Sequence, residues 1–332
     1  MLKKTIRRLG ALAMVLAMAV SVFAVNASAE GAEEQPATTT AITQIPFTKM
    51  IDHNEEAAYA PATSFVFTVT KATPGENETY GTTGAPVYEG VEGAVTITNP
   101  AAFSPDTGKS ANGSINFIAS KFTKPGIYKY TVKETDTGYD GMTYDTTERT
   151  LYVFVQNKTG GGYEVYGAEL VKNGEKSDEF VNTYVTGTLT VGKDITGTGA
   201  NLNGTYTIKV KIDGTEGEKY KATFKDSVTD LESGKQYEFT MGNGDRMTIN
   251  GLSASDKCTV TEEEANTDGY NTTGQIENKP FSEITGATAI IVNNKENTAP
   301  TGVIMTIAPY ALMVVLAGAF AVVFLTRRNR AE

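Results

Sequence analysis

Short runs in which apolar residues recur at every second position fill much of residues 46–296, and they constrain the fold more than any other feature. This two-residue period is that of a β-strand with one buried face. Asn173-Gly174 and Asn243-Gly244 are typical of the tight turn of a β-hairpin. Because many short strands with turn signals favour packed sheets, the sequence predicts an all-β fold of β-sandwiches. The clearest strand runs are 65–71, 128–134, 151–157, 205–212 and 236–241.

The strand-rich part of the chain contains an internal repeat in which Lys, Glu and Asn recur in the same order. The first copy begins PFTKMI, contains YTVKE and ends EFVNTY, and the second begins LTVGKDI, contains CTVTE and ends IIVNNK. The repeat divides near 183–187. We therefore predict two tandem β-sandwich domains, at 46–184 and 187–296. Residues 30–45 have no strand or helix period and are interpreted as a flexible arm.

In each copy the repeated polar residues share a strand face with apolar neighbours, because alternate residues of a strand point the same way. They are Lys49, Glu134 and Asn182 in the first copy and Lys193, Glu262 and Asn293 in the second. Burial of an unpaired charge is costly. One interpretation is therefore a buried Lys–Glu ion pair with Asn as an additional hydrogen-bond partner.

A second interpretation is a covalent cross-link. Burial lowers the pKa of a lysine and raises that of a glutamate, and a neutral amine is a nucleophile. The lysine could attack the side-chain carbonyl of Asn and expel ammonia, while Glu moves the proton and donates a hydrogen bond to the oxyanion. In the second copy Asn294 is the alternative to Asn293, and the shared Val-x-Glu spacing favours Glu262 over Glu263 and Glu264.

The two ends of the chain carry targeting signals. Residues 1–29 combine a basic start, an apolar stretch and a small-residue triplet, which predicts a signal peptide cleaved between Ala29 and Glu30. Residues 303–325 are uncharged and long enough to cross a bilayer, and the basic tail 326–332 follows them. We expect a secreted protein with a transient membrane anchor.

The segment before the apolar stretch reads Thr298-Ala299-Pro300-Thr301-Gly302. With the stretch and the basic tail it resembles the cell-wall sorting signal of Gram-positive surface proteins, so 298–332 is interpreted as that signal. The resemblance implies that a sortase cuts between Thr301 and Gly302 and joins Thr301 to an amine. Thr298 and Ala299 depart from the usual Leu-Pro-x-Thr-Gly pattern, which leaves the class of sortase open.

The repeated Lys, Glu and Asn resemble those of the streptococcal pilin isopeptide-linkage domain in the first copy and of Cna-B-type domains in the second. The resemblance implies immunoglobulin-like β-sandwiches with a bond between Lys49 and Asn182, promoted by Glu134. In the second domain it implies a bond between Lys193 and Asn293, promoted by Glu262. Each bond forms once, so no enzyme activity is expected.

The whole chain is similar to a two-domain major pilin, the backbone subunit of a Gram-positive surface pilus (fimbrium). The resemblance implies a covalent polymer of this chain, anchored to peptidoglycan by sortase, with minor pilins and host surface ligands as further partners in adhesion. The candidate acceptor lysines are Lys172, slightly preferred for its place beside the Asn173-Gly174 turn, and Lys176. The alternatives are a monomeric wall-anchored adhesin and a minor pilin at the tip or base.

Composition excludes several other classes of function. A single cysteine, Cys258, allows no internal disulfide, and one histidine, His53, leaves no ordinary zinc cluster. A serine hydrolase triad would have to use His53. The formal net charge is −10, so no nucleic-acid partner is expected. We predict neither a cofactor nor a metal ion.

Overall fold

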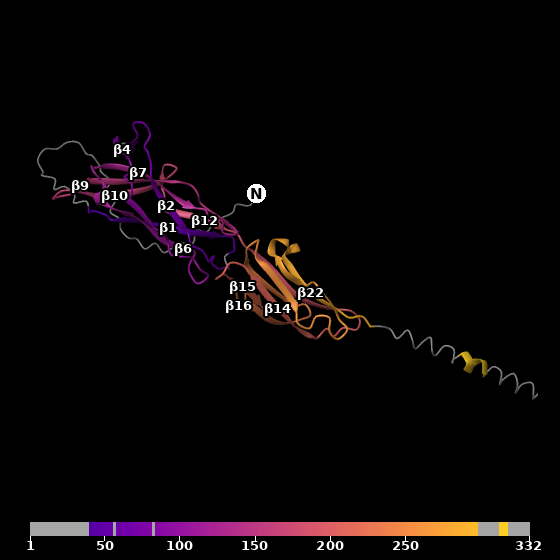
Figure 1. The fold of residues 1–332 in the computed structure, drawn as a ribbon. Helices are drawn as coiled ribbons and strands as arrows, with labels where there is room; N and C mark the ends of the chain where they lie inside the picture. Colours follow the sequence, from indigo (N-terminus) through magenta and orange to yellow (C-terminus); the bar gives the residue numbers. More distant parts are fainter. Residues whose placement is uncertain (1–39, 56–57, 82–83, 298–311, 318–332) are drawn as a thin grey trace, which may run out of the picture. The chain divides into compact units, whose positions relative to one another are not determined.

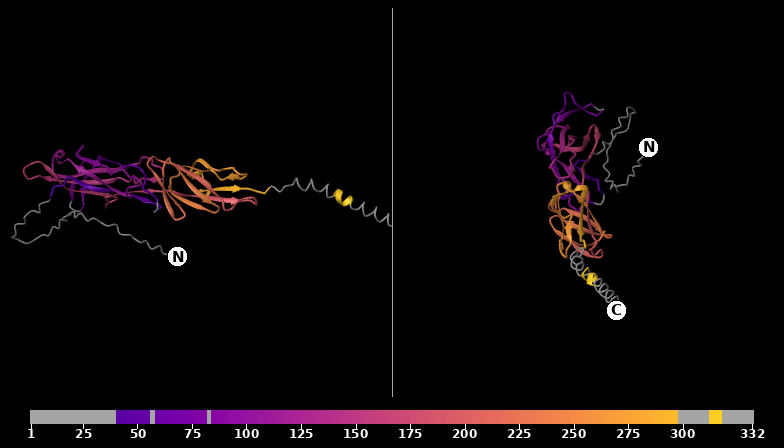
Figure 2. Two further views of the ribbon diagram at one scale, coloured as in Figure 1. Left: turned by 90° about the horizontal axis from the view of Figure 1, so that it is seen from below. Right: turned by 90° about the vertical axis from the view of Figure 1, so that its right-hand side faces the viewer.

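A computed structural model describes residues 40–55, 58–81, 84–297 and 312–317. Its strands confirm the predicted all-β fold (Figures 1 and 2). The predicted signal peptide with its cleavage site at Ala29 and Glu30, most of the arm 30–45 and the sorting motif 298–302 lie outside the described residues. Most of the apolar stretch 303–325 and all of the basic tail 326–332 also lie outside them. No helix among the described residues is both long enough and apolar enough to span a bilayer.

The strands that lie between residues 44 and 184 form two sheets. One has the order β5-β6-β1-β12-β8, and the other has the order β11-β10-β9-β7-β4-β3, with β2 also paired to β7. The members of the first sheet are β5 (Val95–Thr98), β6 (Ser110–Phe117), β1 (Gln44–His53), β12 (Glu179–Tyr184) and β8 (Met142–Thr143). Those of the second are β11 (Glu175–Lys176), β10 (Tyr163–Lys172), β9 (Arg149–Asn157), β7 (Gly126–Thr135), β4 (Ala85–Glu89), β3 (Thr79–Tyr80) and β2 (Val66–Lys71).

The strands that lie between residues 187 and 294 form two further sheets, with the orders β16-β15-β18-β13-β22-β20 and β17-β14-β19-β21. The first contains β16 (Ser227–Glu232), β15 (Lys219–Phe224), β18 (Arg246–Leu252), β13 (Gly187–Thr196), β22 (Thr288–Asn294) and β20 (Asn271–Thr273). The second contains β17 (Gln236–Gly242), β14 (Thr205–Asp213), β19 (Lys257–Glu262) and β21 (Ile276–Pro280). Three short 3₁₀ turns accompany the strands, at Ala119–Lys121, Phe281–Glu283 and Thr285–Ala287.

In both sandwiches the first and last strands are parallel neighbours, β1 with β12 and β13 with β22. Figure 1 shows β1 alongside β12 in the first sandwich. The two pairs also share a register. Lys49 lies opposite Phe180, which places Asn182 opposite the residue two positions after the lysine. Asn293 likewise lies opposite Ile195, two positions after Lys193.

Each sandwich encloses its own apolar core, and the two cores differ in character. In the first, Phe47, Phe67 and Phe180 pack edge-on, with ring centroids 4.8 to 5.6 Å apart. Such aromatic pairs stabilise a core beyond the area they bury. The second core is mainly aliphatic, with Leu189 and Ile291 fully buried, and it also contains the Cys258 thiol.

One of the two predicted hairpin turns is correct and the other is wrong. Asn173 and Gly174 both have positive φ and join β10 to β11 as a tight hairpin. Asn243-Gly244 joins β17 to β18, but these strands belong to different sheets, so the turn is a crossover between layers. The Asn243 side chain accepts a hydrogen bond from the Ile195 backbone N–H at 2.8 Å, which serves sheet packing instead of strand pairing.

Candidate functional site

In the first sandwich the structure brings Lys49, Glu134 and Asn182 together in the core, with no exposed surface on any of them. Strands β1 and β12 of one sheet supply Lys49 and Asn182, and β7 of the facing sheet supplies Glu134. Lys49 Nζ donates to Glu134 Oε2 at 3.0 Å, and Asn182 Nδ2 donates to Glu134 Oε1 at 2.7 Å. The carboxylate therefore bridges the amine and the amide.

The surroundings of Lys49 destabilise its charged form relative to water. Burial lowers the pKa of Lys49 to about 8, although the nearby Glu134 carboxylate opposes the change. Burial also raises the pKa of Glu134, and the charge and hydrogen bond of Lys49 offset this only in part. The Lys49 amine lies 4.7 Å from the centroid of the Phe65 ring. Because both pKa values move toward the neutral forms, transfer of a proton from Lys49 to Glu134 costs less than in water.

The second sandwich repeats this arrangement. Lys193 on β13 and Asn293 on β22 are fully buried, and Glu262 reaches them from β19 of the facing sheet. Lys193 Nζ and Glu262 Oε2 form an ion pair at 2.8 Å, and Asn293 Nδ2 donates to Glu262 Oε1 at 2.6 Å. Burial lowers the pKa of Lys193 against the pull of Glu262. The lysine amine lies 4.6 Å from the centre of the Tyr206 ring.

The alternative residues of the second sandwich lie elsewhere. Asn294 accepts a hydrogen bond from Thr196 on the neighbouring strand. Glu263 pairs with Lys209, and Glu264 binds the backbone and hydroxyl of Thr207. The structure therefore places Asn293 and Glu262 beside Lys193.

Two contacts to the asparagine carbonyl oxygens were not foreseen from the sequence. The backbone N–H of Asp145 donates to Asn182 Oδ1 at 2.8 Å. The Thr272 hydroxyl donates to Asn293 Oδ1 at 2.7 Å. Both donors come from the chain on the far side of the last strand, just after β8 in one sandwich and on β20 in the other. No motif connects them, so the repeat offered no signal for them.

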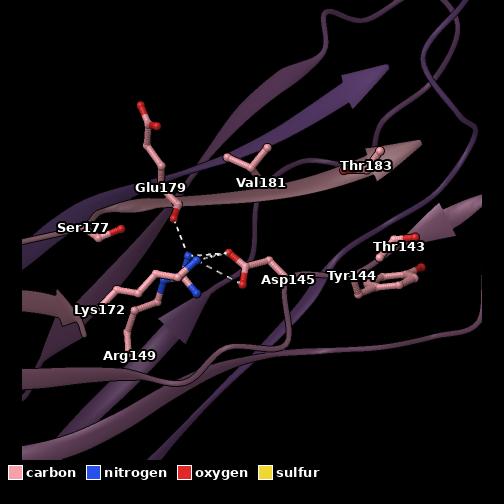
Figure 3. A pocket seen from close by; sticks show the side chains of 9 residues that line it. All are labelled: Thr143, Tyr144, Asp145, Arg149, Lys172, Ser177, Glu179, Val181 and Thr183. Carbon is pink, nitrogen blue, oxygen red and sulfur yellow. Dashed lines mark hydrogen bonds and ion pairs between the residues drawn. The ribbon is translucent and has the colours of Figure 1, made fainter. Parts of the chain in front are cut away.

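Around Asp145 lies the cavity drawn in Figure 3, with a volume of about 390 Å³. Arg149 Nη2 and Lys172 Nζ bind the Asp145 carboxylate at 2.7 and 3.1 Å, and Arg149 also donates to the Glu179 carbonyl at 2.6 Å. Burial alone would raise the pKa of Asp145, but the hydrogen bonds from Arg149 and Lys172 outweigh it and hold that pKa well below its usual range. These contacts fix the segment whose backbone N–H meets Asn182. The cavity is lined by Thr143, Tyr144, Asp145, Arg149, Lys172, Ser177, Glu179, Val181 and Thr183.

The two candidate acceptor lysines lie in different environments. Lys172, at the end of β10, is ion-paired with Asp145, and its side chain is 32% exposed. Lys176 lies on the short strand β11 and is exposed. No ion pair to Lys176 is found among the residues that the structure describes.

The described part of the chain also contains no group of three or more side chains that could hold a metal ion.

Comparison with known proteins finds a matching family for each of the two sandwiches. Residues 45–185 match the family described as Spy0128-like isopeptide containing domain, and residues 187–295 match a domain of unknown function (DUF7601). A curated protein named "Pilin", from Streptococcus pyogenes serotype M1, is 27% identical over 317 residues, which cover 85% of this chain and 90% of that protein. Residues 45–185 therefore belong to the family of Spy0128-like isopeptide containing domains.

Solved structures show the same fold as this chain. The major pilin protein T3.2 of Streptococcus pyogenes matches with a TM-score of 0.62 at 21% identity, covering 78% of this chain and 99% of that one. The crystal structure of the major pilin from Streptococcus pyogenes matches with a TM-score of 0.59 at 22% identity, covering 77% and 99%. The curated relative and both of these solved structures are thus named as pilins of Streptococcus pyogenes.

Proposed function

We propose that this pilin is a backbone subunit whose two sandwiches, 46–184 and 187–296, each form an intramolecular Lys–Asn isopeptide bond. The observation that carries the proposal is the recurrence of one buried arrangement in both sandwiches. In each, a glutamate bridges a lysine amine and an asparagine amide at 2.6 to 3.0 Å. A buried ion pair alone would not require the third residue or the shared strand register.

The chemistry balances without a cofactor. Lys49 transfers a proton to Glu134, and the neutral Nζ bonds to Cγ of Asn182. The Cγ–Nδ2 bond then breaks, and Nδ2 leaves as ammonia with a proton delivered by Glu134. Of the five hydrogens on the starting ammonium and amide, one stays on the new amide and three leave with ammonia. The fifth stays on Glu134 or leaves to give ammonium. Lys193, Asn293 and Glu262 act in the same way.

Each bond would join the first strand of a sandwich to its parallel neighbour, the last strand. Tension that enters by β1 would then leave by β12 through covalent bonds, without loading the hydrogen bonds of the sheets. This property suits a subunit within a covalent fibre. An amide also resists reducing agents, unlike the disulfide that many secreted proteins use.

We further propose that a sortase cuts between Thr301 and Gly302 and joins Thr301 to a lysine of the next subunit, or finally to peptidoglycan. Exposure favours Lys176 as the acceptor, since Lys172 is held by Asp145. Minor pilins and host surface ligands are the further partners expected of such a fibre. A monomeric wall-anchored adhesin and a minor pilin are the competing functions.

Intact mass tests the cross-links. Residues 30–301 should weigh about 34 Da less than their sequence requires, since each bond loses one ammonia of about 17 Da. Replacement of Glu134 by Gln should restore half of the deficit, and replacement of both Glu134 and Glu262 should restore all of it. A full mass in the parent protein would leave both sites as buried ion pairs.

A denaturing gel of cell-wall extracts tests the polymer. A backbone subunit gives a ladder of covalent multimers, and Lys176→Arg should abolish the ladder while preserving charge. Lys172→Arg is the matched control and should leave the ladder intact. A single band from the parent strain would favour the monomeric adhesin, and a ladder lost only in Lys172→Arg would reassign the acceptor.

A further inference from the structure

The orientation of the two reactive asparagine amides is fixed by their hydrogen-bond partners. A backbone N–H can only donate, so the Asn182 atom that faces the Asp145 N–H must be the carbonyl oxygen. An ionised glutamate can only accept, so the amide nitrogen must face Glu134. The leaving nitrogen therefore lies against the carboxylate, and the carbonyl oxygen lies on the opposite side of the amide.

The second sandwich reaches the same orientation with different atoms. Thr272 Oγ1 accepts a hydrogen bond from the Asn266 backbone N–H at 2.9 Å, which leaves its own proton free to donate. That proton goes to Asn293 Oδ1 at 2.7 Å, and Asn293 Nδ2 faces Glu262. Thr272 is buried and lies directly opposite Asn293 in the β20–β22 pair.

This geometry differs from the expectation that each glutamate donates to the developing oxyanion. The negative charge that forms during attack resides on Oδ1, which each glutamate does not contact in this orientation. A preformed donor aimed at such an oxygen, in a site closed to water, lowers the barrier substantially. Each glutamate is instead placed to take the lysine proton and deliver it to the departing nitrogen.

We propose that the Asp145 backbone N–H and the Thr272 hydroxyl are the oxyanion donors of the two cross-linking reactions, and that Thr272 is a catalytic residue of the second. The inference rests on the proposed isopeptide chemistry. It assigns proton transfer to the glutamates and stabilisation of the oxyanion to the Asp145 N–H and the Thr272 hydroxyl. In the first sandwich the ion pairs of Asp145 with Arg149 and Lys172 hold the donor segment in place (Figure 3). Lys172 thereby has a positioning role.

The test is the rate of bond formation in the full chain. Cell-free synthesis with a short isotopic pulse gives newly made chains, which are denatured at intervals and digested. Mass spectrometry then follows the cross-linked peptides Lys49–Asn182 and Lys193–Asn293 separately. Thr272→Val removes the hydroxyl and keeps the shape, and Thr272→Ser keeps the hydroxyl. Asn266→Gly removes the side-chain oxygen that binds the Thr272 backbone N–H but leaves the Thr272 hydroxyl in place.

We expect Thr272→Val to slow the Lys193–Asn293 bond on the order of 100-fold, the usual effect of losing one oxyanion donor. The Lys49–Asn182 bond of the same molecules should form at the parent rate. Thr272→Ser and Asn266→Gly should stay within a few-fold of the parent. Thermolysin resistance of the second domain, sampled at the same times, reports folding, and Thr272→Ala replaces Thr272→Val if the latter is not resistant.

A parent-like rate in folded Thr272→Val would overturn the inference, as would equal slowing by Thr272→Ser or Asn266→Gly, which would indicate a structural role. Failure of the proposed cross-linking function would be seen in the parent chain and not in the variants. If the parent chain never yields the Lys193–Asn293 peptide, the cross-link itself is absent. If the parent yields it and Thr272→Val yields it equally fast, only the oxyanion assignment fails.

Discussion

Asn182→Ala should lower the thermal stability of the first sandwich by an amount set mainly by the length of the loop that the bond closes. The proposed bond would join residues 49 and 182, so the cross-link would constrain almost the whole domain in the unfolded state. Loop-closure entropy for about 134 residues corresponds to about 5 kcal/mol at 25 °C. With an unfolding entropy of about 2.1 cal/mol/K per residue, this loss shifts the Tm of a domain of this size by about 15–20 °C.

Differential scanning calorimetry of the two-domain protein measures this effect. Only the transition of the first sandwich should move, because the proposed bond between Lys193 and Asn293 would be unaffected. Glu134→Gln should produce a similar shift by a different route. Thr183→Ala is the matched control, since Thr183 is exposed on the same strand and its loss should move the Tm by a few degrees at most.

The reasoning would be refuted if the mass of Asn182→Ala fell only about 17 Da below its own sequence mass, which shows loss of one of the two bonds, yet the variant unfolded within a few degrees of the parent. Loop closure would then contribute little, and the stability of the sandwich would reside in its core. A fall of the same size in Thr183→Ala would show that β12 is generally sensitive to substitution.

Three further outcomes follow from the structure. The rate at which the Lys49–Asn182 bond forms should depend on pH as a bell-shaped curve that falls above about pH 8, because Lys49 and Glu134 must together hold one proton for the reaction. A rate that stays constant up to pH 10 in the pulse assay would contradict this. Burial, with help from Glu218, raises the pKa of Asp256 from 3.8 to about 7, so the contribution of this group to stability is fully present below about pH 4 and is lost as pH rises through 7. Urea unfolding of Asp256→Asn should lack that fall, which amounts to at most about 4 kcal/mol, and an unchanged pH profile would exclude this group. A Cβ added at Gly113 would lie 2.3 Å from the Phe47 ring, so Gly113→Ala should cost about 1–3 kcal/mol in urea unfolding, and a neutral result would show that the ring can move.

The strand period and the repeat were sufficient to predict the fold class. Alternation assigned the faces of β7 and β19, and it placed Glu134 and Glu262 with apolar neighbours that prove to be buried. Such information is local, since it depends only on which side of its own strand a residue occupies. Turn residues carry equally local information, and Asn173-Gly174 correctly predicted the hairpin between β10 and β11.

What the sequence could not supply depends on contacts between distant segments. The Asp145 donor is a backbone N–H, so the type of side chain at this position does not indicate that the residue contacts Asn182. Thr272 lies on a strand of three residues, too short for a period, and its partner Asn293 is 21 positions away. The Asn243-Gly244 turn failed as a hairpin for a related reason, because turn residues do not reveal whether the next strand joins the same sheet.

The shared register of the first and last strands has a consequence for quality control. The two reactive residues meet only when β1 and β12 pair as described, with Asn182 opposite Ile51. A slip of one position would turn Asn182 to the opposite face of the sheet, away from Lys49. Each proposed bond, once formed, would therefore mark permanently that its domain has reached the correct pairing at least once. Subunits that never reached this pairing would keep the full sequence mass. The fraction of chains with the lower mass would therefore measure the fraction that had folded correctly, even in an old sample.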